Sequence, residues 1–183
     1  VEQLLPRGIN SFIDIGANDG VLFSNTFKFA KSGAAGVCVD PSLSTYRKLC
    51  LNHLFHFNVK CIHGAVSSKN GYMFLKEDGY EETLSSVNEV KCEKSLRVKS
   101  FTLDTLLNKY PVFKNVDLLS VDVEGHEKEV FEGLKNTHFY SKIIIVESDK
   151  SQTHDLLSLN SLYDYEPIFT NGINTVLKNK NER

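Results

Sequence analysis

Acidic residues and glycines that could bind a small ligand stand at two points near the start of the sequence. The first point is Asp14-x-Gly16-x-x-x-Gly20, in which the glycines permit a sharp turn and a close approach of backbone to ligand. The second is Asp40, which ends another apolar run, where a carboxylate can accept hydrogen bonds from both hydroxyls of a ribose. Together they predict a nucleoside ligand, although each alone could be a simple turn or a helix cap.

The loop Gly16–Gly20 (GANDG) also indicates which nucleoside. It lacks the second close glycine of G-x-G-x-x-G, which brings a helix N-terminus onto a pyrophosphate. Asn18 and Asp19 occupy the loop instead, and the Asp19 carboxylate would repel a pyrophosphate. The ammonium and sulfonium groups of S-adenosylmethionine suit an acidic loop better. The loop therefore favours S-adenosylmethionine, with an NAD-dependent dehydrogenase as a weak alternative.

A third acidic group is the block Asp122-Val123-Glu124-Gly125-His126-Glu127, and Glu147 ends a later apolar run. If the preceding strand continues, Asp122 and Glu124 project on one side, because side chains alternate along a strand. Carboxylates and an imidazole at the carboxyl end of a strand can act as a general base or hold a metal. We predict Asp122, Glu124, His126 and Glu147 as the catalytic group.

Two mechanisms are compatible with this group. In one, His126 or a carboxylate accepts the proton, and an imidazole suits this role near neutral pH. In the other, Asp122, Glu124 and Glu147 hold Mg²⁺ or Mn²⁺, which binds vicinal hydroxyls and lowers their pKa. His126 could also simply cap the helix that follows it.

The elements that position these residues alternate between strand and helix. Short apolar or alternating runs predict strands at Ser11–Ile15, Ala35–Asp40, Val59–Ser67, Tyr72–Leu75, Leu96–Leu103, Val116–Val123, Lys142–Glu147, Tyr165–Thr170 and Asn174–Leu177. Helical spacing predicts helices at Leu22–Ser32, Ser44–Phe55, Asp104–Lys109 and His126–Leu134. This alternation predicts a mostly parallel sheet, in which ligands bind outside the carboxyl ends of the strands.

Several longer segments resemble one known family. They are Phe12–Thr26 (FIDIGANDGVLFSNT), Val39–Ser42, Gly64–Ser68, Leu103–Leu107, Asp117–Leu134 (DLLSVDVEGHEKEVFEGL) and Ile143–Ser148. On these segments the chain resembles the FkbM-type S-adenosylmethionine-dependent methyltransferases, and the D-V-E-G-x-E block is the most family-specific part.

The resemblance implies a Rossmann-like class I methyltransferase fold, α/β, with a mostly parallel seven-stranded sheet and helices on both faces. It also implies methyl transfer to a hydroxyl of a sugar, a glycan or a similar small acceptor. Carried over by position, the methionine end of the cofactor lies along Asp14–Gly20, including Gly16, Ala17, Asn18 and Gly20. Asp40 and Pro41 lie at the ribose, and Ala65 and Val66 lie beside the adenine. The family commonly has glutamate at the position of Asp40.

Composition limits the partners and the compartment. The chain has 183 residues and a formal net charge of −2, which argues against a bare nucleic-acid binder, since neutralising phosphates supplies most of the affinity of such proteins. Four scattered cysteines without a C-x-x-C pair indicate a reducing, cytoplasmic setting. No run is long and apolar enough to span a bilayer. We expect one domain over residues 1–183, with residues 1–10 as a lead-in and 179–183 as a polar tail, and the start of the sequence suggests a piece of a longer chain.

Two other functions remain open from the sequence. One is a methyltransferase that acts on RNA or protein, and the other is a non-catalytic module that retains the fold to bind partners. The long polar segment Glu77–Leu96 is expected to be a loop that contributes to acceptor specificity. Neither the acceptor nor the oligomeric state can be derived from the residues.

Overall fold

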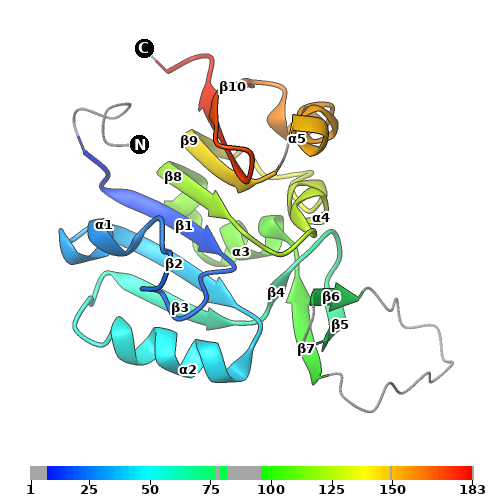
Figure 1. Cartoon of the computed structure of the whole chain (residues 1–183). Coiled ribbons are helices and arrows are strands. Elements are labelled where there is room, and N and C mark those ends of the chain that lie inside the picture. The colour runs from blue at the N-terminus through cyan, green and yellow to red at the C-terminus, as the bar shows by residue number, and fades with distance from the viewer. Residues whose placement is uncertain (1–7, 77–78, 82–95, 149, 183) are drawn as a thin grey trace, which may run out of the picture.

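The structure of the protein is a computed structural model that describes residues 8–76, 79–81, 96–148 and 150–182. Its main feature is a seven-stranded sheet in the order β10-β11-β9-β8-β1-β2-β3 (Figure 1). All neighbouring strands are parallel except β11, which is antiparallel to both β9 and β10. The strands are β1 (Ser11–Ile15), β2 (Ala35–Asp40), β3 (Val59–His63), β8 (Asn115–Val121), β9 (Tyr140–Glu147), β10 (Tyr165–Thr170) and β11 (Asn174–Asn179).

Helices cover both faces of this sheet, so its central strands are apolar on both sides. On one face, α1 (Phe27–Lys31) and α2 (Leu43–Asn52) pack Phe29 and Leu49 against Phe12 of β1. On the other face, α3 (Leu103–Lys109), α4 (Glu127–Glu132) and α5 (Lys150–Leu157) pack against Ile13 and its neighbours. The short 3₁₀ helices η1 (Pro111–Lys114) and η2 (Asn160–Leu162) complete this second layer. The predicted mostly parallel α/β fold is confirmed.

A second, smaller sheet lies beyond the carboxyl ends of the large one, in the order β4-β7-β5-β6 (Figure 1). It is formed by β4 (Ala65–Val66), β5 (Gly71–Lys76), β6 (Gly79–Glu81) and β7 (Leu96–Phe101). The prediction of one strand over Val59–Ser67 was therefore wrong, because the segment changes sheets at Gly64. A Cβ at Gly64 would lie 2.6 Å from the Phe101 ring, so only glycine passes this close to β7.

Several other predictions of the elements need correction. The strand β8 ends at Val121, not Val123, so strand alternation does not place Asp122 and Glu124. The first helix occupies only Phe27–Lys31, because residues 21–26 form turns and bends. Helix α5 was not expected, because its hydrophobic face is weak. Most of the predicted loop Glu77–Leu96 lies outside the described residues, but Gly79–Glu81 forms β6.

No described helix is long and apolar enough to cross a membrane.

Candidate active site

Asp14 and Asp40 lie on the same face of two neighbouring strands, at their carboxyl ends. Cys38 is the register partner of Asp14, and both Cys38 and Asp40 point to the face that α1 and α2 cover, since alternate residues share a face. The register places both carboxyl groups at neighbouring strand ends, and burial raises the pKa of Asp14, to which the charges of Asp122 and Asp40 add. The two predicted ligand contacts therefore face a common site.

Asp14 is buried, and its carboxylate is held by hydroxyl groups. Thr26 Oγ1 donates a hydrogen bond to Asp14 Oδ2 at 2.5 Å, and Ser120 of β8 is a second side-chain partner. Burial raises the pKa of Asp14 to about 6, against the lowering effect of these two hydrogen bonds. Asp14 therefore joins β1, the turn before α1 and β8 at the centre of the carboxyl edge.

Asp40 connects the end of β2 to the glycine loop. Its Oδ2 accepts the backbone N–H of Asn18 at 2.9 Å, and its Oδ1 accepts the N–H of Ser42 at 2.9 Å. The Thr45 hydroxyl also donates to Oδ1. Burial raises the pKa of Asp40, and these three donors oppose the rise. Oδ2 accepts one described hydrogen bond, so this oxygen retains acceptor capacity for a ribose hydroxyl.

Gly16 allows the loop Gly16–Gly20, which we call the cofactor loop, to lie directly against the loop that follows β8. Its φ of +81° is in the left-handed region, and a Cβ there would lie 1.7 Å from the backbone oxygen of Asp122. Gly20 is equally constrained, with φ of +78° and a Cβ position 2.5 Å from Leu49 and 2.8 Å from His53 Nε2. Both glycines of the motif are therefore required by backbone geometry.

Of the three residues between these glycines, only Asn18 has an exposed side chain. Ala17 is buried and its N–H donates to the Val39 oxygen at 3.0 Å, whereas Asn18 is exposed with φ of +52°. Asp19 Oδ1 accepts the N–H groups of Val21 and Leu22, so this carboxylate closes the turn after the loop.

Ala65 and Val66, predicted beside the adenine, have buried side chains that pack into hydrophobic clusters. They can therefore offer mainly backbone to a ligand. Gly64 directly precedes them, and its N–H donates to the backbone carbonyl oxygen of Asp40 at 3.0 Å, so Ala65 and Val66 lie close to the end of β2. Pro41 is buried, and its carbonyl oxygen lies 2.9 Å from His63 Nε2.

The segment after β8 is a tight loop rather than extended strand. Glu124 has φ of +54° and is followed by Gly125 at +91°, so the chain reverses immediately after Asp122. Glu127 Oε1 accepts the N–H groups of Val123 and Gly125, both at 3.1 Å, and fixes this reversal. Asp122 and Glu124 are exposed at the carboxyl edge, which leaves both carboxylates available to a ligand.

Glu147 and Asp122 form a pair of carboxyl groups at the ends of the neighbouring strands β8 and β9. The pKa of Glu147 is raised to about 7, first by desolvation and then by a hydrogen bond with Asp122 and the charge of Asp122. Glu124 and Glu127 contribute further negative charge. A proton shared by two carboxylates has this effect, because two like charges at close range cannot both ionise easily.

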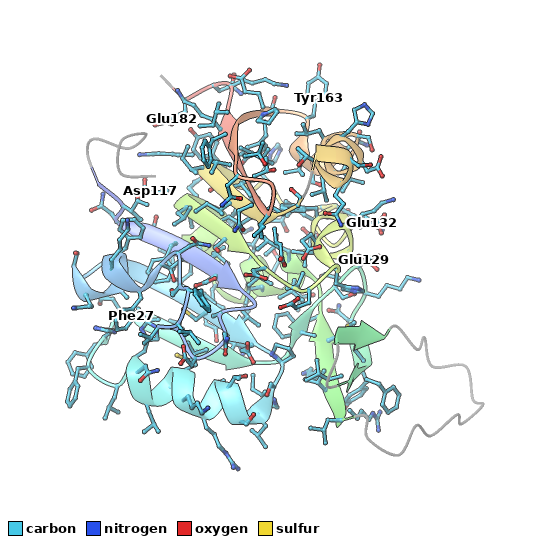
Figure 2. The ribbon with its side chains drawn as sticks, in the orientation of Figure 1. Phe27, Asp117, Glu129, Glu132, Tyr163 and Glu182 are labelled. Atoms are coloured by element: carbon cyan, nitrogen blue, oxygen red, sulfur yellow. The ribbon has the colours of Figure 1, made fainter. Side chains whose placement is uncertain are left out.

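His126 lies at the N-cap position of α4 and is buried at 7% exposure. Its Nε2 lies 3.1 Å from Ser67 Oγ, and its Nδ1 lies 3.6 Å from a Glu129 carboxylate oxygen (Glu129 is labelled in Figure 2). The imidazole thus connects the end of β4 to α4. Its role in proton transfer stays a prediction, and its burial favours a positioning role.

The carboxylates do not form a metal centre. Among residues 8–76, 79–81, 96–148 and 150–182, no three His, Cys, Asp or Glu side chains converge in a way that could hold a metal ion. The predicted set Asp122, Glu124 and Glu147 therefore does not fit Mg²⁺ or Mn²⁺, and the metal mechanism is not supported.

Sequence reasoning missed the polar groups that hold the acids in place. Thr26, Ser120, Asn25 and Thr45 surround Asp14 and Asp40, and Asn25 Nδ2 donates to Ser120 Oγ at 3.2 Å. Ser120 had a usable signal: it is the one hydroxyl within the apolar run Leu118–Val121, on the face shared with Asp14. Asn25 and Thr26 had no such signal, because the sequence predicts a helix over Leu22–Ser32, whereas α1 begins only at Phe27.

Comparison with known proteins places this arrangement in a family. The model of the methyltransferase FkbM domain matches residues 14–167, which include all the acids described above. The chain belongs to the FkbM methyltransferase family. Membership of this family implies S-adenosylmethionine as the cofactor. No curated protein matches the chain.

Solved structures share the fold of this FkbM domain at low identity. A methyltransferase FkbM from Methylobacillus flagellatus has a TM-score of 0.58 and 10% identity, over 92% of this chain and 43% of that one. A methyltransferase from Geobacter sulfurreducens has a TM-score of 0.53 and 12% identity, over 97% of this chain and 73% of that one. The FkbM domain described here thus spans less than half of the Methylobacillus chain. These matches confirm the Rossmann-like methyltransferase fold.

Proposed function

We propose that this FkbM domain is an S-adenosylmethionine-dependent O-methyltransferase that acts on a hydroxyl of a sugar, a glycan or a similar small acceptor. The observation that carries the proposal is the common face of Asp14 and Asp40, directly beside the loop of Asp122. A cofactor bound along the first two strand ends would thus lie next to Asp122, whose charge helps to raise the pKa of Glu147.

The chain's own residues fit this cofactor. The glycines let the Gly16–Gly20 loop pack against the Asp122 backbone and against Leu49, and Asp14 and Asn18 lie along this loop. Asp40 offers acceptor capacity at Oδ2 for a ribose hydroxyl. The backbone of Ala65 and Val66 follows Gly64, which is bonded to Asp40, and would lie on one side of the adenine.

When bound, S-adenosylmethionine supplies a methyl group that is already electrophilic on its sulfonium. The protein has to orient the acceptor hydroxyl and remove its proton. Glu147 suits the second task, because a pKa of about 7 leaves it partly ionised and basic near neutral pH. Its carboxylate accepts the hydroxyl proton as the acceptor oxygen forms its new bond to carbon, and Asp122 shares that proton.

The charges around Glu147 favour a neutral, hydroxylated acceptor. Asp122, Glu124 and Glu147 are all acidic, so a nucleic-acid backbone would be repelled from this edge. Vicinal hydroxyls, in contrast, can each donate a hydrogen bond to a carboxylate.

The test is a methyl-transfer screen with methyl-labelled donor over monosaccharides, glycosides, peptides and RNA, with calorimetry of S-adenosylhomocysteine in parallel. We expect micromolar binding of S-adenosylhomocysteine and label on a hydroxylated small acceptor. Label only on peptide or RNA would overturn the acceptor assignment. No binding of S-adenosylhomocysteine would favour a non-catalytic module instead. Activity should survive exhaustive EDTA treatment.

A further inference from the structure

The layer formed by α1 and α2 carries an unusual set of exposed apolar side chains. Phe23, Phe55 and Phe57 are 93%, 80% and 88% exposed, far beyond the exposure of a packed aromatic ring. We call the following group the α2 patch: Leu22, Phe23, Leu51, Leu54, Phe55 and Phe57. Single exposed apolar residues are ordinary, but a concentration of them on one layer marks an interaction surface.

Hydrogen bonds hold the parts of the α2 patch next to one another. Asn52 Nδ2 donates to the Asp19 oxygen at 2.8 Å, which fixes the Leu22–Phe23 turn beside the end of α2. Asn58 Nδ2 donates to the Gly33 oxygen at 3.1 Å and joins the turn after α2 to the end of α1. Phe27 of α1 lies between the two helices (Figure 2) and contacts the rings of His53 and His56.

Positive charge surrounds this patch, although the whole chain is net negative. Residues 21–63 contain five lysine or arginine residues and a single acid, Asp40, which is buried. Lys31, Arg47 and Lys48 are exposed on α1 and α2. Asp19, just outside this range, stays ionised, because the N–H groups of Leu22 and Val21 and the charge of Lys48 lower its pKa, so it offsets one of these cations. The layer therefore combines exposed apolar side chains with an excess of positive charge.

We propose that the α2 patch docks the protein on an anionic lipid surface. Phe55, Phe57 and their apolar neighbours would enter the boundary between headgroups and acyl chains, and Lys31, Arg47 and Lys48 would lie at the anionic headgroups. The α2 patch includes no residue of the Gly16–Gly20 loop and none of the carboxylates Asp122, Glu124 and Glu147, although Asp19 of the loop adjoins it through Asn52. The inference thus goes beyond the proposed function and does not depend on it.

Charge and shape favour this occupant over two others. A second copy of the chain would bring the same cations against themselves, which costs electrostatic energy. A nucleic acid could stack on the three phenylalanines, but it offers no apolar partner to Leu22, Leu51 and Leu54. An anionic bilayer offers negative headgroups to the cations and acyl chains to the aliphatic side chains.

The experiment is cosedimentation of the full chain with vesicles of phosphatidylcholine alone and of phosphatidylcholine with phosphatidylserine. We expect binding to the mixed vesicles that weakens as salt is added. The variant Phe55→Ser/Phe57→Ser should bind at least about tenfold more weakly, since two buried rings are lost. The variant Arg47→Ala/Lys48→Ala should bind about 30-fold more weakly, as each cation near such a surface contributes about fivefold.

Matched variants on the opposite layer serve as controls. Val112→Ser/Tyr163→Ser removes two exposed apolar groups there, and Lys109→Ala/Lys128→Ala removes two exposed cations. Both should bind vesicles like the parent chain. Circular dichroism and binding of S-adenosylhomocysteine report whether each variant is folded.

Four results would overturn the proposal: no binding of the parent chain to mixed vesicles, equal binding to neutral vesicles, equal losses in the control variants, or a dimer that Phe55→Ser/Phe57→Ser converts to monomer. Patch-dependent binding to RNA in the absence of vesicle binding would assign the surface to a nucleic acid instead. Failure of methyl transfer in the screen above would leave these vesicle measurements unaffected, so the two proposals can fail separately.

Discussion

The Oδ2 atom of Asp40 accepts the backbone N–H of Asn18 at 2.9 Å, so the end of β2 fixes the position of the cofactor loop that follows β1. Asp40 is therefore a loop-positioning residue as well as a proposed ribose contact. Both of its oxygens are used as acceptors by described donors, and this makes the carboxylate hard to replace.

Asp40→Asn should weaken binding of S-adenosylhomocysteine by at least about tenfold and lower stability by about 1–3 kcal/mol, because an amide NH₂ would face a backbone donor. Asp19→Asn is the matched control: Asp19 Oδ1 alone accepts the Val21 and Leu22 N–H groups, and asparagine keeps that oxygen. Calorimetry measures the binding of S-adenosylhomocysteine by each variant, and urea unfolding measures its stability. Equal effects of the two substitutions would contradict the role given to Asp40.

Gly16→Ala should cost roughly 3–5 kcal/mol of stability and abolish cofactor binding, because its Cβ would overlap the Asp122 oxygen. Gly33→Ala separates the clash from the backbone strain. Gly33 has φ of +92° but nothing within 4 Å of its Cβ position, so only about 1–2 kcal/mol is expected there. Thermal unfolding compares the two, and similar losses would show that the Asp122 contact is unimportant.

Thr26→Val should destabilise the protein by about 1–3 kcal/mol, because the buried Asp14 carboxylate loses a donor. The pKa of Asp14 is raised to about 6 in the folded chain, so the folded state holds a proton that the unfolded state has released between about pH 4 and 6. Stability therefore falls as pH rises through this window. The variant raises this pKa further, so its loss should be larger near pH 8 than near pH 5.

Urea unfolding at the two pH values measures this difference. Thr105→Val, which removes an exposed hydroxyl bonded to Asn70, is the control and should show no such pH dependence. A Thr26→Val effect that is independent of pH would contradict the link to Asp14.

Glu147→Gln should reduce turnover by about 10²–10⁴-fold while leaving S-adenosylhomocysteine binding intact, since it removes the proton acceptor. In the parent enzyme, kcat/KM should rise with pH through about 7, as the carboxyl pair loses its shared proton. Asp122→Asn removes the neighbouring charge, so the pKa of Glu147 falls and this rise should move to lower pH. An unchanged profile in Asp122→Asn would exclude the pair as the titrating group.

His126→Ala should lower stability and turnover together but leave the pH dependence of kcat/KM in place, as expected of a positioning residue. The buried imidazole connects Ser67 to α4, and its removal leaves that contact empty. His138→Ala, at an exposed position, is the control. Loss of the acidic limb of the profile in His126→Ala would instead identify the imidazole as the base.

The cofactor half of the site could be predicted because its residues are local. Asp14, Gly16 and Gly20 follow one strand, and Asp40 ends the next, so the rule for carboxyl ends of parallel strands brings them together. β1 and β2 have the predicted bounds, because their apolar runs end at clear turn residues.

The rest depended on contacts between distant residues. The change of sheets at Gly64 is decided by how closely the chain passes Phe101, and no local pattern shows this. The loop at Glu124 leaves the extended conformation because Glu127 accepts two of its N–H groups, so the strand ends two residues earlier than its apolar pattern. Burial of His126 likewise depends on Ser67, which lies 59 positions away in the chain.

The contact between Gly16 and the Asp122 carbonyl has a consequence for redesign. At this contact the two loops meet through main-chain atoms, the one proposed to bind the methyl donor and the other to carry Asp122. We therefore expect side-chain changes elsewhere on the rim to alter acceptor preference without moving these two loops apart. Selection for new acceptors in such a scaffold should accumulate substitutions around this contact and spare the two residues that make it.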